Sequence, residues 1–357
     1  MISIERSLAV RALTFGYANA RVKAMKQSLL SSRETQALAE AKDNEELFVL
    51  LERTSYKQDL VSGALREKTI PDQIELACSH NFSGTLEKII QITPKKHREK
   101  IRKLFEKYEI NNIKAMLNAK HMGLGKDEIS QLILETGILS KAMHNRLLSA
   151  KTVREIVIEL GVTPYGRALE KVYKKYEKEK EVAILIAALD EYYYNNIPKI
   201  AKLGFGEEKA IISMLKAQAD AKNISSMLRG KKENLSETEI RKTLVSEGSI
   251  SKEKINRALK AKSVEESAKV FERTHNISMA IDAFKKTGSL IPIELELEKG
   301  IARKGLKTLR TSNLSLQAIA GFLLLKEEEI NNIRKIARAK EFSLSPEKMK
   351  EMLVEVQ

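Results

Sequence analysis

Apolar residues recur at helical spacing along this chain. The pattern is clearest where Ile101, Leu104, Phe105 and Tyr108 follow one another at steps of three and four residues, with charged residues between them. One face of such a helix is apolar and the other faces are polar, which is typical of a helix that packs on a core. The sequence contains no run of strict apolar and polar alternation and no Asn-Gly or Asp-Gly hairpin signal. The pattern predicts an all-α fold.

Several polar residues mark the starts of helices. Ser236 is followed three residues later by Glu239, which is the spacing of a capping box. Proline follows Thr163, Ser345 and Ile291, and proline fits the first turn of a helix because its missing N–H would have no partner there. We therefore expect helices to begin at these four places.

The chain repeats itself at a period of about 110 residues. Residues 137–155 and 248–266 share ten of nineteen amino acids at an offset of 111. The tripeptide Glu-Arg-Thr ends at Thr54 and again at Thr274, and Thr163 lies between them. The chain is therefore interpreted as three copies of one helical unit, which bury a shared core between neighbours. We expect repeat units at 55–163 and 164–274, with the remaining helical repeat formed by the chain ends, 1–54 and 275–357.

A second landmark supports the triplication. An apolar residue followed three positions later by Met or Ile occurs at Val22, Ile113, Ile224 and Ile333. The distance from this landmark to the following repeated threonine is 50 residues in the two later copies and 32 residues in the first. The first copy is therefore 18 residues shorter. The periodicity fits either a closed ring around a pseudo-threefold axis or an open stack, and it does not choose between them.

Charge and length narrow the class of protein. The 357 residues correspond to two or three domains, and 63 Lys and Arg against 48 Asp and Glu give a net charge of +15. This excess is spread along the chain instead of forming a basic tail or domain. The densest basic run, residues 95–107, is interpreted as a solvated helix face; the alternative is a surface for acidic protein or anionic lipid headgroups.

Hydropathy and cysteine content indicate a soluble, intracellular chain. The longest uncharged stretch, residues 311–325, has fifteen residues, whereas a membrane span needs about 20 apolar ones. Charged residues from Glu5 onward interrupt any apolar core of a secretory signal. Cys78 is the single cysteine, which excludes an intrachain disulfide and fits a reducing compartment.

The sequence carries no recognisable catalytic, metal or cofactor motif. Residues 120–127 imitate part of a phosphate-binding loop, but Lys120 replaces its first glycine and Asp127 its Ser or Thr. The pair Gly204 and Gly206 lacks the third glycine of a dinucleotide turn. We expect both glycine clusters to end helices. The five histidines lack metal-ligand spacing, and a buried, inert thiol is expected at Cys78. No cofactor and no small-molecule substrate are expected.

Two segments resemble a known family. Residues 15–26, FGYANARVKAMK, resemble the N-terminal helix signature of the C subunit of archaeal and bacterial A/V-type ATPases, the counterpart of the d subunit in eukaryotic V-type ATPases. Residues 189–194, LDEYYY, are also similar to that family. From the residues alone, the three tyrosines are expected to seal helix packing, because consecutive positions on a helix point in different directions.

The resemblance implies a funnel of three similar helical domains around a pseudo-threefold axis. It also implies a non-catalytic rotor connector that links the central-stalk subunits D and F to the membrane proteolipid (c/K) ring and transmits torque between ATP turnover and ion transport. Such a protein has no active site of its own and is a peripheral membrane protein on the cytoplasmic face of the cell membrane. The alternative from the net charge is a basic helical-repeat nucleic-acid-binding scaffold, which the even spread of charge disfavours.

Four residues are candidates for partner binding within this interpretation. Arg21, Asn112, Asn223 and Asn332 each stand directly before one of the apolar landmarks. Equivalent helices would project them to one place, which would be an axial cavity that receives a partner. The alternative is that they are structural polar residues that hydrogen-bond nearby backbone.

Overall fold

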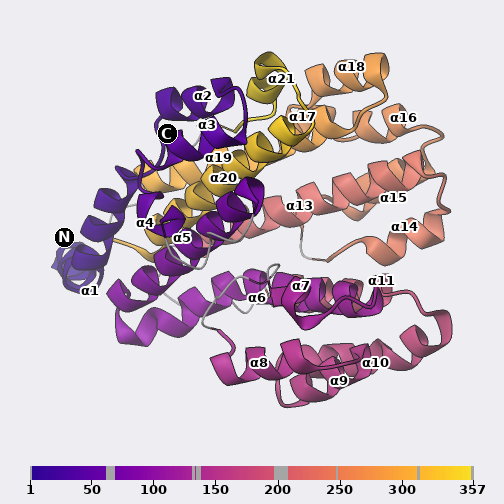
Figure 1. The fold of residues 1–357 in the computed structure, drawn as a ribbon, viewed down its shortest axis with the longest axis horizontal. Coiled ribbons are helices and arrows are strands. Elements are labelled where there is room, and N and C mark those ends of the chain that lie inside the picture. Colours follow the sequence, from indigo (N-terminus) through magenta and orange to yellow (C-terminus); the bar gives the residue numbers. More distant parts are fainter. Residues whose placement is uncertain are drawn as a thin grey trace.

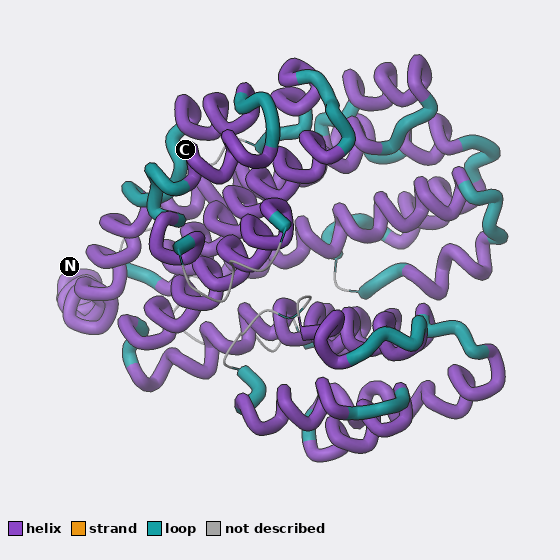
Figure 2. Tube along the Cα trace, in the orientation of Figure 1, coloured by secondary structure: helices purple, strands orange, loops and turns teal. Residues whose placement is uncertain are grey.

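The structure is a computed structural model that describes residues 2–61, 69–130, 133, 138–196, 208–246, 248–311 and 314–354. All regular structure in this part of the chain is helical (Figure 2), so the predicted all-α class is confirmed. The long helices are α1 (Ile2–Lys26), α5 (Ile70–Ile92), α6 (Arg98–His121), α10 (Pro164–Glu179), α11 (Ala183–Asn195), α13 (Glu208–Lys232), α19 (Ile291–Thr311) and α20 (Leu316–Glu341).

Shorter helices connect the long ones (Figure 1). They are α2 (Ser32–Glu40), α3 (Asn44–Leu51), α4 (Lys57–Leu60), α7 (Lys126–Ser130), α8 (Lys141–Ser149), α9 (Val153–Glu159), α14 (Glu237–Thr243), α15 (Lys252–Lys260), α16 (Val264–Lys269), α17 (Glu272–His275), α18 (Ser278–Thr287) and α21 (Pro346–Glu351), with 3-10 turns at Lys95–His97 and Leu160–Val162.

The helix starts expected from sequence are confirmed. Ser236 caps α14, where its hydroxyl accepts from the Glu239 N–H at 3.2 Å while the Glu239 carboxylate accepts from the Ser236 N–H at 2.8 Å. Thr163 caps α10 through the Gly166 N–H. The helices α19 and α21 begin at the two remaining proline sites, directly after residue 290 and residue 345.

The basic run at residues 95–107 forms the 3-10 turn and the first part of α6. Its apolar positions are buried as predicted, and the Tyr108 ring packs edge-on against Phe82 with centroids 4.6 Å apart. Further along, the glycine at residue 123 has φ +78° and follows the end of α6, so helix termination is confirmed there. Gly204 and Gly206 lie outside the described residues.

The repeat is visible in the helix bounds. The pair α8 and α9 recurs as α15 and α16 at an offset of 111. It also matches α2 and α3 at an offset of 109, a copy that the sequence comparison missed. In each copy a serine caps the first helix by accepting an N–H three residues ahead, at Ser31, Ser140 and Ser251.

Three equivalent long helices carry these pairs. They are α6, α13 and α20, and each packs against another long helix: α6 against α11, α13 against α19, and α20 against both α5 and α19. A large core contains buried residues of both chain ends and of the helices up to residue 215, and a second core spans residues 224 to 297. Figure 1 shows the indigo N-terminal helices beside the yellow C-terminal helices.

The chain ends explain the missing 18 residues of the first copy. In the middle of the chain, α15 and α16 pack with α13 and α14, which precede them in sequence. The equivalent pair α2 and α3 packs instead with α20 and α21 from the C-terminus. Lys350 of α21 contacts the Glu40 carboxylate of α2 at 2.6 Å. The C-terminal helices therefore take the place that a longer N-terminal copy would fill.

Candidate functional site

The three long helices each carry one buried acidic residue at the same position of the repeat. They are Glu109 on α6, Asp220 on α13 and Glu329 on α20, each four residues before the apolar landmark. Their exposed fractions are 0%, 1% and 1%. Carboxylates are rarely buried without partners, because removal from water disfavours the charged form strongly. The fold must therefore supply polar partners for these three carboxylates.

Each carboxylate accepts a backbone N–H from the residue before the capping serine. Glu109 accepts from Leu139 at 3.2 Å and Asp220 accepts from Ile250 at 3.1 Å. Glu329 accepts from Leu30. These three N–H groups come from equivalent positions, just ahead of α8, α15 and α2. We call the three bonds the carboxylate clamps; each fixes the approach of a short helix pair to a long helix.

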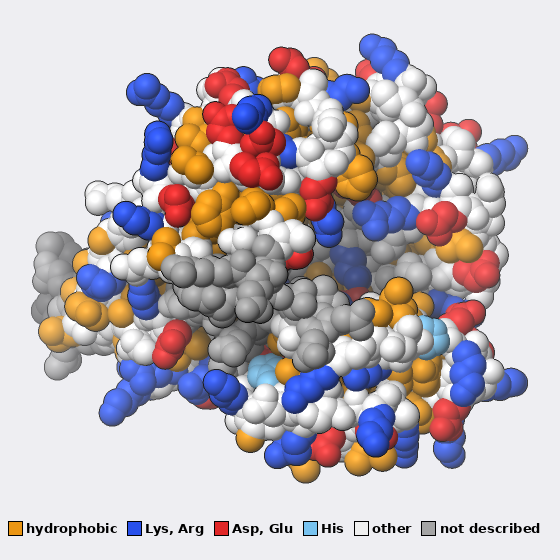
Figure 3. All heavy atoms as spheres, viewed as in Figure 1, with side chains coloured by type: hydrophobic (Ala, Val, Ile, Leu, Met, Phe, Trp, Pro, Cys, Tyr) orange, Lys and Arg blue, Asp and Glu red, His pale blue; other side chains and the backbone are white. Residues whose placement is uncertain are grey.

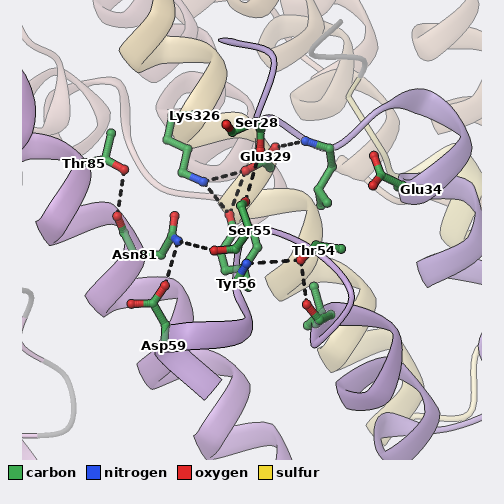
Figure 4. Close-up of polar contacts among 12 residues, drawn as sticks. Ser28, Glu34, Thr54, Ser55, Tyr56, Asp59, Asn81, Thr85, Lys326 and Glu329 are labelled. Atoms are coloured by element: carbon green, nitrogen blue, oxygen red, sulfur yellow. Dashed lines mark hydrogen bonds and ion pairs between the residues drawn. The ribbon is translucent and has the colours of Figure 1, made fainter. Parts of the chain in front are cut away.

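The Glu329 clamp joins the two ends of the chain. Its donor, Leu30, lies 299 residues earlier in the sequence. Figure 4 shows that Lys326 and Tyr56 converge on the same carboxylate: the Lys326 ammonium lies 2.7 Å from Glu329 and the Tyr56 hydroxyl donates to it at 2.8 Å. All three side chains are buried, so their hydrogen bonds are strengthened by the low local dielectric.

A second repeated bond reinforces this closure. Lys231 of α13 donates to the carbonyl of Leu259 at the end of α15. The equivalent Lys340 of α20 donates at 3.2 Å to the carbonyl of Ala39 at the end of α2. A lysine suits these positions because the last carbonyls of a helix carry partial negative charge. The chain ends thus interact through the bond that the third copy, residues 164–274, makes within itself.

The three predicted asparagines are buried, with exposed fractions of 2–3%. Asn223 exchanges two hydrogen bonds with the backbone of Val245, both at 2.8 Å. Asn332 exchanges the same pair with Val354, at 2.6 and 2.9 Å. In these two copies the amide therefore holds the chain segment that follows the short helix, as in the structural alternative. Contact of these asparagines or of Asn112 with a partner stays a prediction.

We expect Asn223→Ala to lower the free energy of unfolding by about 2–3 kcal/mol, because a buried N–H and C=O of Val245 lose their partners. Asn111→Ala is the matched control, since Asn111 is exposed on α6, and we expect it to change stability by less than about 0.5 kcal/mol. Urea denaturation of both variants measures the difference. Equal stability of the two variants would contradict the structural role of Asn223.

The fourth candidate, Arg21, is exposed on α1. The same helix also exposes Leu13 and Tyr17, whereas its opposite face buries Phe15, Ala18 and Val22 in the core. The structure therefore does not bring Arg21 together with the buried asparagines. Arg21 stays a prediction for partner contact.

The LDEYYY segment lies on α11, between two long helices. Asp190 forms ion pairs with Lys114 of α6 and with Lys222 of α13, the latter at 2.5 Å. Tyr193 is buried, and Tyr192 donates from its hydroxyl to Glu106 at 3.0 Å. The segment therefore ties α6, α11 and α13 together, and its tyrosines pack among helices as expected.

The first halves of α6, α13 and α20 meet at a small cavity of about 40 Å³. Its lining includes Leu104, Leu215 and Leu324, which hold the same position in the three copies. Beside it, Lys107 of α6 contacts Glu327 of α20 at 2.5 Å. Equivalent positions of the three copies thus face one point of the molecule.

The described residues contain no group of three or more His, Cys, Asp or Glu that could hold a metal ion. Burial raises the pKa of the Cys78 thiol to about 12, so the reactive thiolate is not formed at neutral pH. A search of the same residues for a helix long and apolar enough to cross a membrane found none.

The carboxylate clamps were not identified from the sequence. The sequence did carry a signal for the helix pairs that the clamps hold: the pattern Ser-x9-Ala-Lys-x3-Glu occurs at residues 31–46, 140–155 and 251–266. In each copy the Glu accepts the N–H of the Lys, at 2.8, 2.7 and 2.9 Å. This pattern places the short helix pairs, but the buried carboxylate that receives them lies elsewhere in the chain.

Comparison with known proteins finds relatives along nearly the whole chain. The family model of the ATP synthase (C/AC39) subunit matches residues 18–352. The chain is 26% identical over 344 residues to the A-type ATP synthase C subunit of Methanocaldococcus jannaschii, covering 95% of this chain and 86% of that protein. It is 28% identical over 355 residues to the C subunit of Pyrococcus furiosus, covering 98% and 93%. A match over nearly the whole chain shows that this protein belongs to the ATP synthase C/AC39 subunit family.

Proposed function

We propose that this protein is a non-catalytic rotor connector of an A/V-type ATPase. It joins the central-stalk subunits D and F to the membrane proteolipid ring and carries torque between them, on the cytoplasmic face of the membrane. Its relatives are named as C subunits of A-type ATP synthases. Membership of that family supports an accessory role in the complex, and the location and the partners are part of the proposal.

The observation that carries this proposal is the Glu329 clamp. It repeats between the chain ends the bond that the other two copies make internally. The clamp therefore completes a third equivalent unit from the two ends of the chain. Three such units arranged around a shaft would hold it and resist twisting, and this arrangement is part of the proposal. Close-packed helices add to this stiffness, because protein interiors have low compressibility.

Surface shape and charge agree with a partner at the ring. The face drawn in Figure 3 is hollowed between α11 and α13, and Lys and Arg side chains lie at the floor of the hollow. Lys and Arg side chains exposed in a recess attract a partner of opposite charge. We therefore expect an acidic partner surface at this recess, with Arg21 as a candidate contact outside it.

The test is affinity capture of the tagged protein from nuclease-treated, gently solubilised native membranes, followed by mass spectrometry. We expect both shaft subunits and the proteolipid at comparable abundance. We also expect Arg21→Glu to lower recovery of these partners severalfold, while Arg33→Glu, an exposed charge reversal on α2, leaves it unchanged. Recovery of ribosomal or nucleic-acid-binding proteins without any ATPase component would overturn the proposal and favour the nucleic-acid-binding alternative.

A further inference from the structure

The Asp220 clamp, in the third copy at residues 164–274, is built differently from the other two clamps. In the first and second copies a tyrosine occupies the position two residues after the repeated threonine, and both tyrosines, Tyr56 and Tyr165, are buried. The equivalent residue of the third copy is Asn276, which is exposed and has φ +54°. The clamp carboxylate is also shorter there, since Asp220 replaces glutamate. Both replacements remove side-chain volume from the same place.

A cavity of about 370 Å³ lies where this volume is missing. Its lining includes Asp220, Lys254, His275, Asn276 and Lys304. Small-molecule pockets in proteins begin at about 300 Å³, so the cavity is large enough for a ligand. The cavity thus lies in the copy in which both of these side chains are smaller.

The two lysines give this cavity unneutralised positive charge. Among the described residues, neither the Lys254 nor the Lys304 ammonium has a hydrogen bond or ion pair. Burial lowers the pKa of His275; the Asp220 carboxylate opposes this shift, and the Lys304 and Lys254 ammonium groups add to it. All three charges therefore act on the same imidazole. Ser249 and Thr274 also line the cavity, but the Ser249 hydroxyl donates to Asp220 and the Thr274 hydroxyl donates to the Phe271 carbonyl. The groups that remain for a ligand are the two ammonium groups, and lysine is a common ligand of phosphate oxygens.

The two acidic residues of the lining are already bound by groups of the protein. The Asp220 carboxylate accepts from the N–H groups of Ser249 and Ile250 at 2.8 and 3.1 Å and also from the Ser249 hydroxyl. Gly248 permits this approach, because a Cβ there would lie 2.3 Å from an Asp220 oxygen. Glu296 lies 3.1 Å from Lys299 and 3.6 Å from Arg303. The donors to Asp220 are neutral, so its carboxylate keeps its charge, and the lining carries the two lysine ammonium groups against this one carboxylate.

We propose that this cavity is a binding site for a phosphate group, contributed by inorganic phosphate or a small soluble phosphate ester. Lys254 approaches from α15 and Lys304 from α19, on opposite elements of the lining. The site belongs to the third copy alone, because the corresponding position of Lys254 is Met143 in the second copy and Glu34 in the first. It does not depend on the proposed rotor function.

Isothermal titration calorimetry of the full chain with inorganic phosphate tests the site. We expect saturable binding that Lys254→Met and Lys304→Gln each weaken by about tenfold, the loss typical of one charge-assisted hydrogen bond. Lys254→Met installs the residue of the second copy, and Lys304 is exposed, so neither change disturbs the core. Lys252→Gln is the control, since Lys252 is exposed on the same helix outside the lining.

Three outcomes would overturn the proposal. The first is that the wild-type chain does not bind phosphate. The second is that the two cavity variants bind phosphate as tightly as Lys252→Gln does, which would place the bound phosphate elsewhere on the protein. In a separate arm, vesicles of phosphatidylglycerol in phosphatidylcholine are mixed with the protein; capture by vesicles without binding of free phosphate would assign the lysines to a lipid surface instead. Binding of phosphate that only the cavity variants weaken supports the proposal.

Discussion

Glu329→Ala lowers the free energy of unfolding by about 3–5 kcal/mol, the cost expected when one partner of a buried ion pair is removed. The substitution leaves the buried Lys326 ammonium without its carboxylate and the Leu30 N–H and Tyr56 hydroxyl without their acceptor. Three buried groups lose a partner at once, and two of them belong to the opposite end of the chain. The effect is therefore expected on stability and on the closure of the chain ends together.

A matched control lies on the same helix. Arg338 and Glu341 form an ion pair at 3.1 Å with the same three-residue spacing as Lys326 and Glu329, but both residues are exposed. We expect Glu341→Ala to cost less than about 1 kcal/mol, because exposed pairs gain little from their charge. Urea denaturation gives both values. Amide exchange at Leu30 provides the second readout, and it should quicken in Glu329→Ala only; equal exchange in the two variants would contradict the clamp.

Gly321→Val produces the second large loss of stability, at the crossing of α19 and α20. A Cβ at Gly321 would lie 2.8 Å from the carbonyl oxygen of Gly305 and 3.0 Å from the backbone N of Leu309. These are backbone atoms, so they cannot turn aside as a flexible side chain would. The two helices must move apart, and overpacking of this kind costs about 1–3 kcal/mol or more.

The control substitution is Gly84→Ala in α5, which should have the opposite sign. A Cβ at Gly84 would meet no atom within 4 Å, and alanine is favoured over glycine inside a helix by about 0.5–1 kcal/mol. We expect thermal denaturation to show a raised midpoint for Gly84→Ala and a lowered one for Gly321→Val. A lowered midpoint for both variants would mean that replacing any helical glycine destabilises the protein. The close approach of α19 and α20 would then not explain the effect of Gly321→Val.

The sequence determined the helices, their caps and the repeat. Capping at Ser236 and Thr163 depends on residues three positions apart, so local spacing is sufficient to predict it. The family resemblance also came from contiguous strings and is confirmed by the match over residues 18–352. Partner contacts of Arg21 and of the three asparagines stay predictions, because no partner contact can be inferred from spacing alone.

Only the tertiary structure decided how the copies are joined. The Leu30 N–H could have met a carboxylate of any copy, and its partner Glu329 is 299 residues away. The spacing of motifs along the chain shows that the copies are equivalent. Equivalent copies can form the same hydrogen bonds, so the spacing does not show which copy supplies each partner. That choice follows from three-dimensional packing, in which α20 and α21 fill the place left by the 18 residues that the first copy lacks.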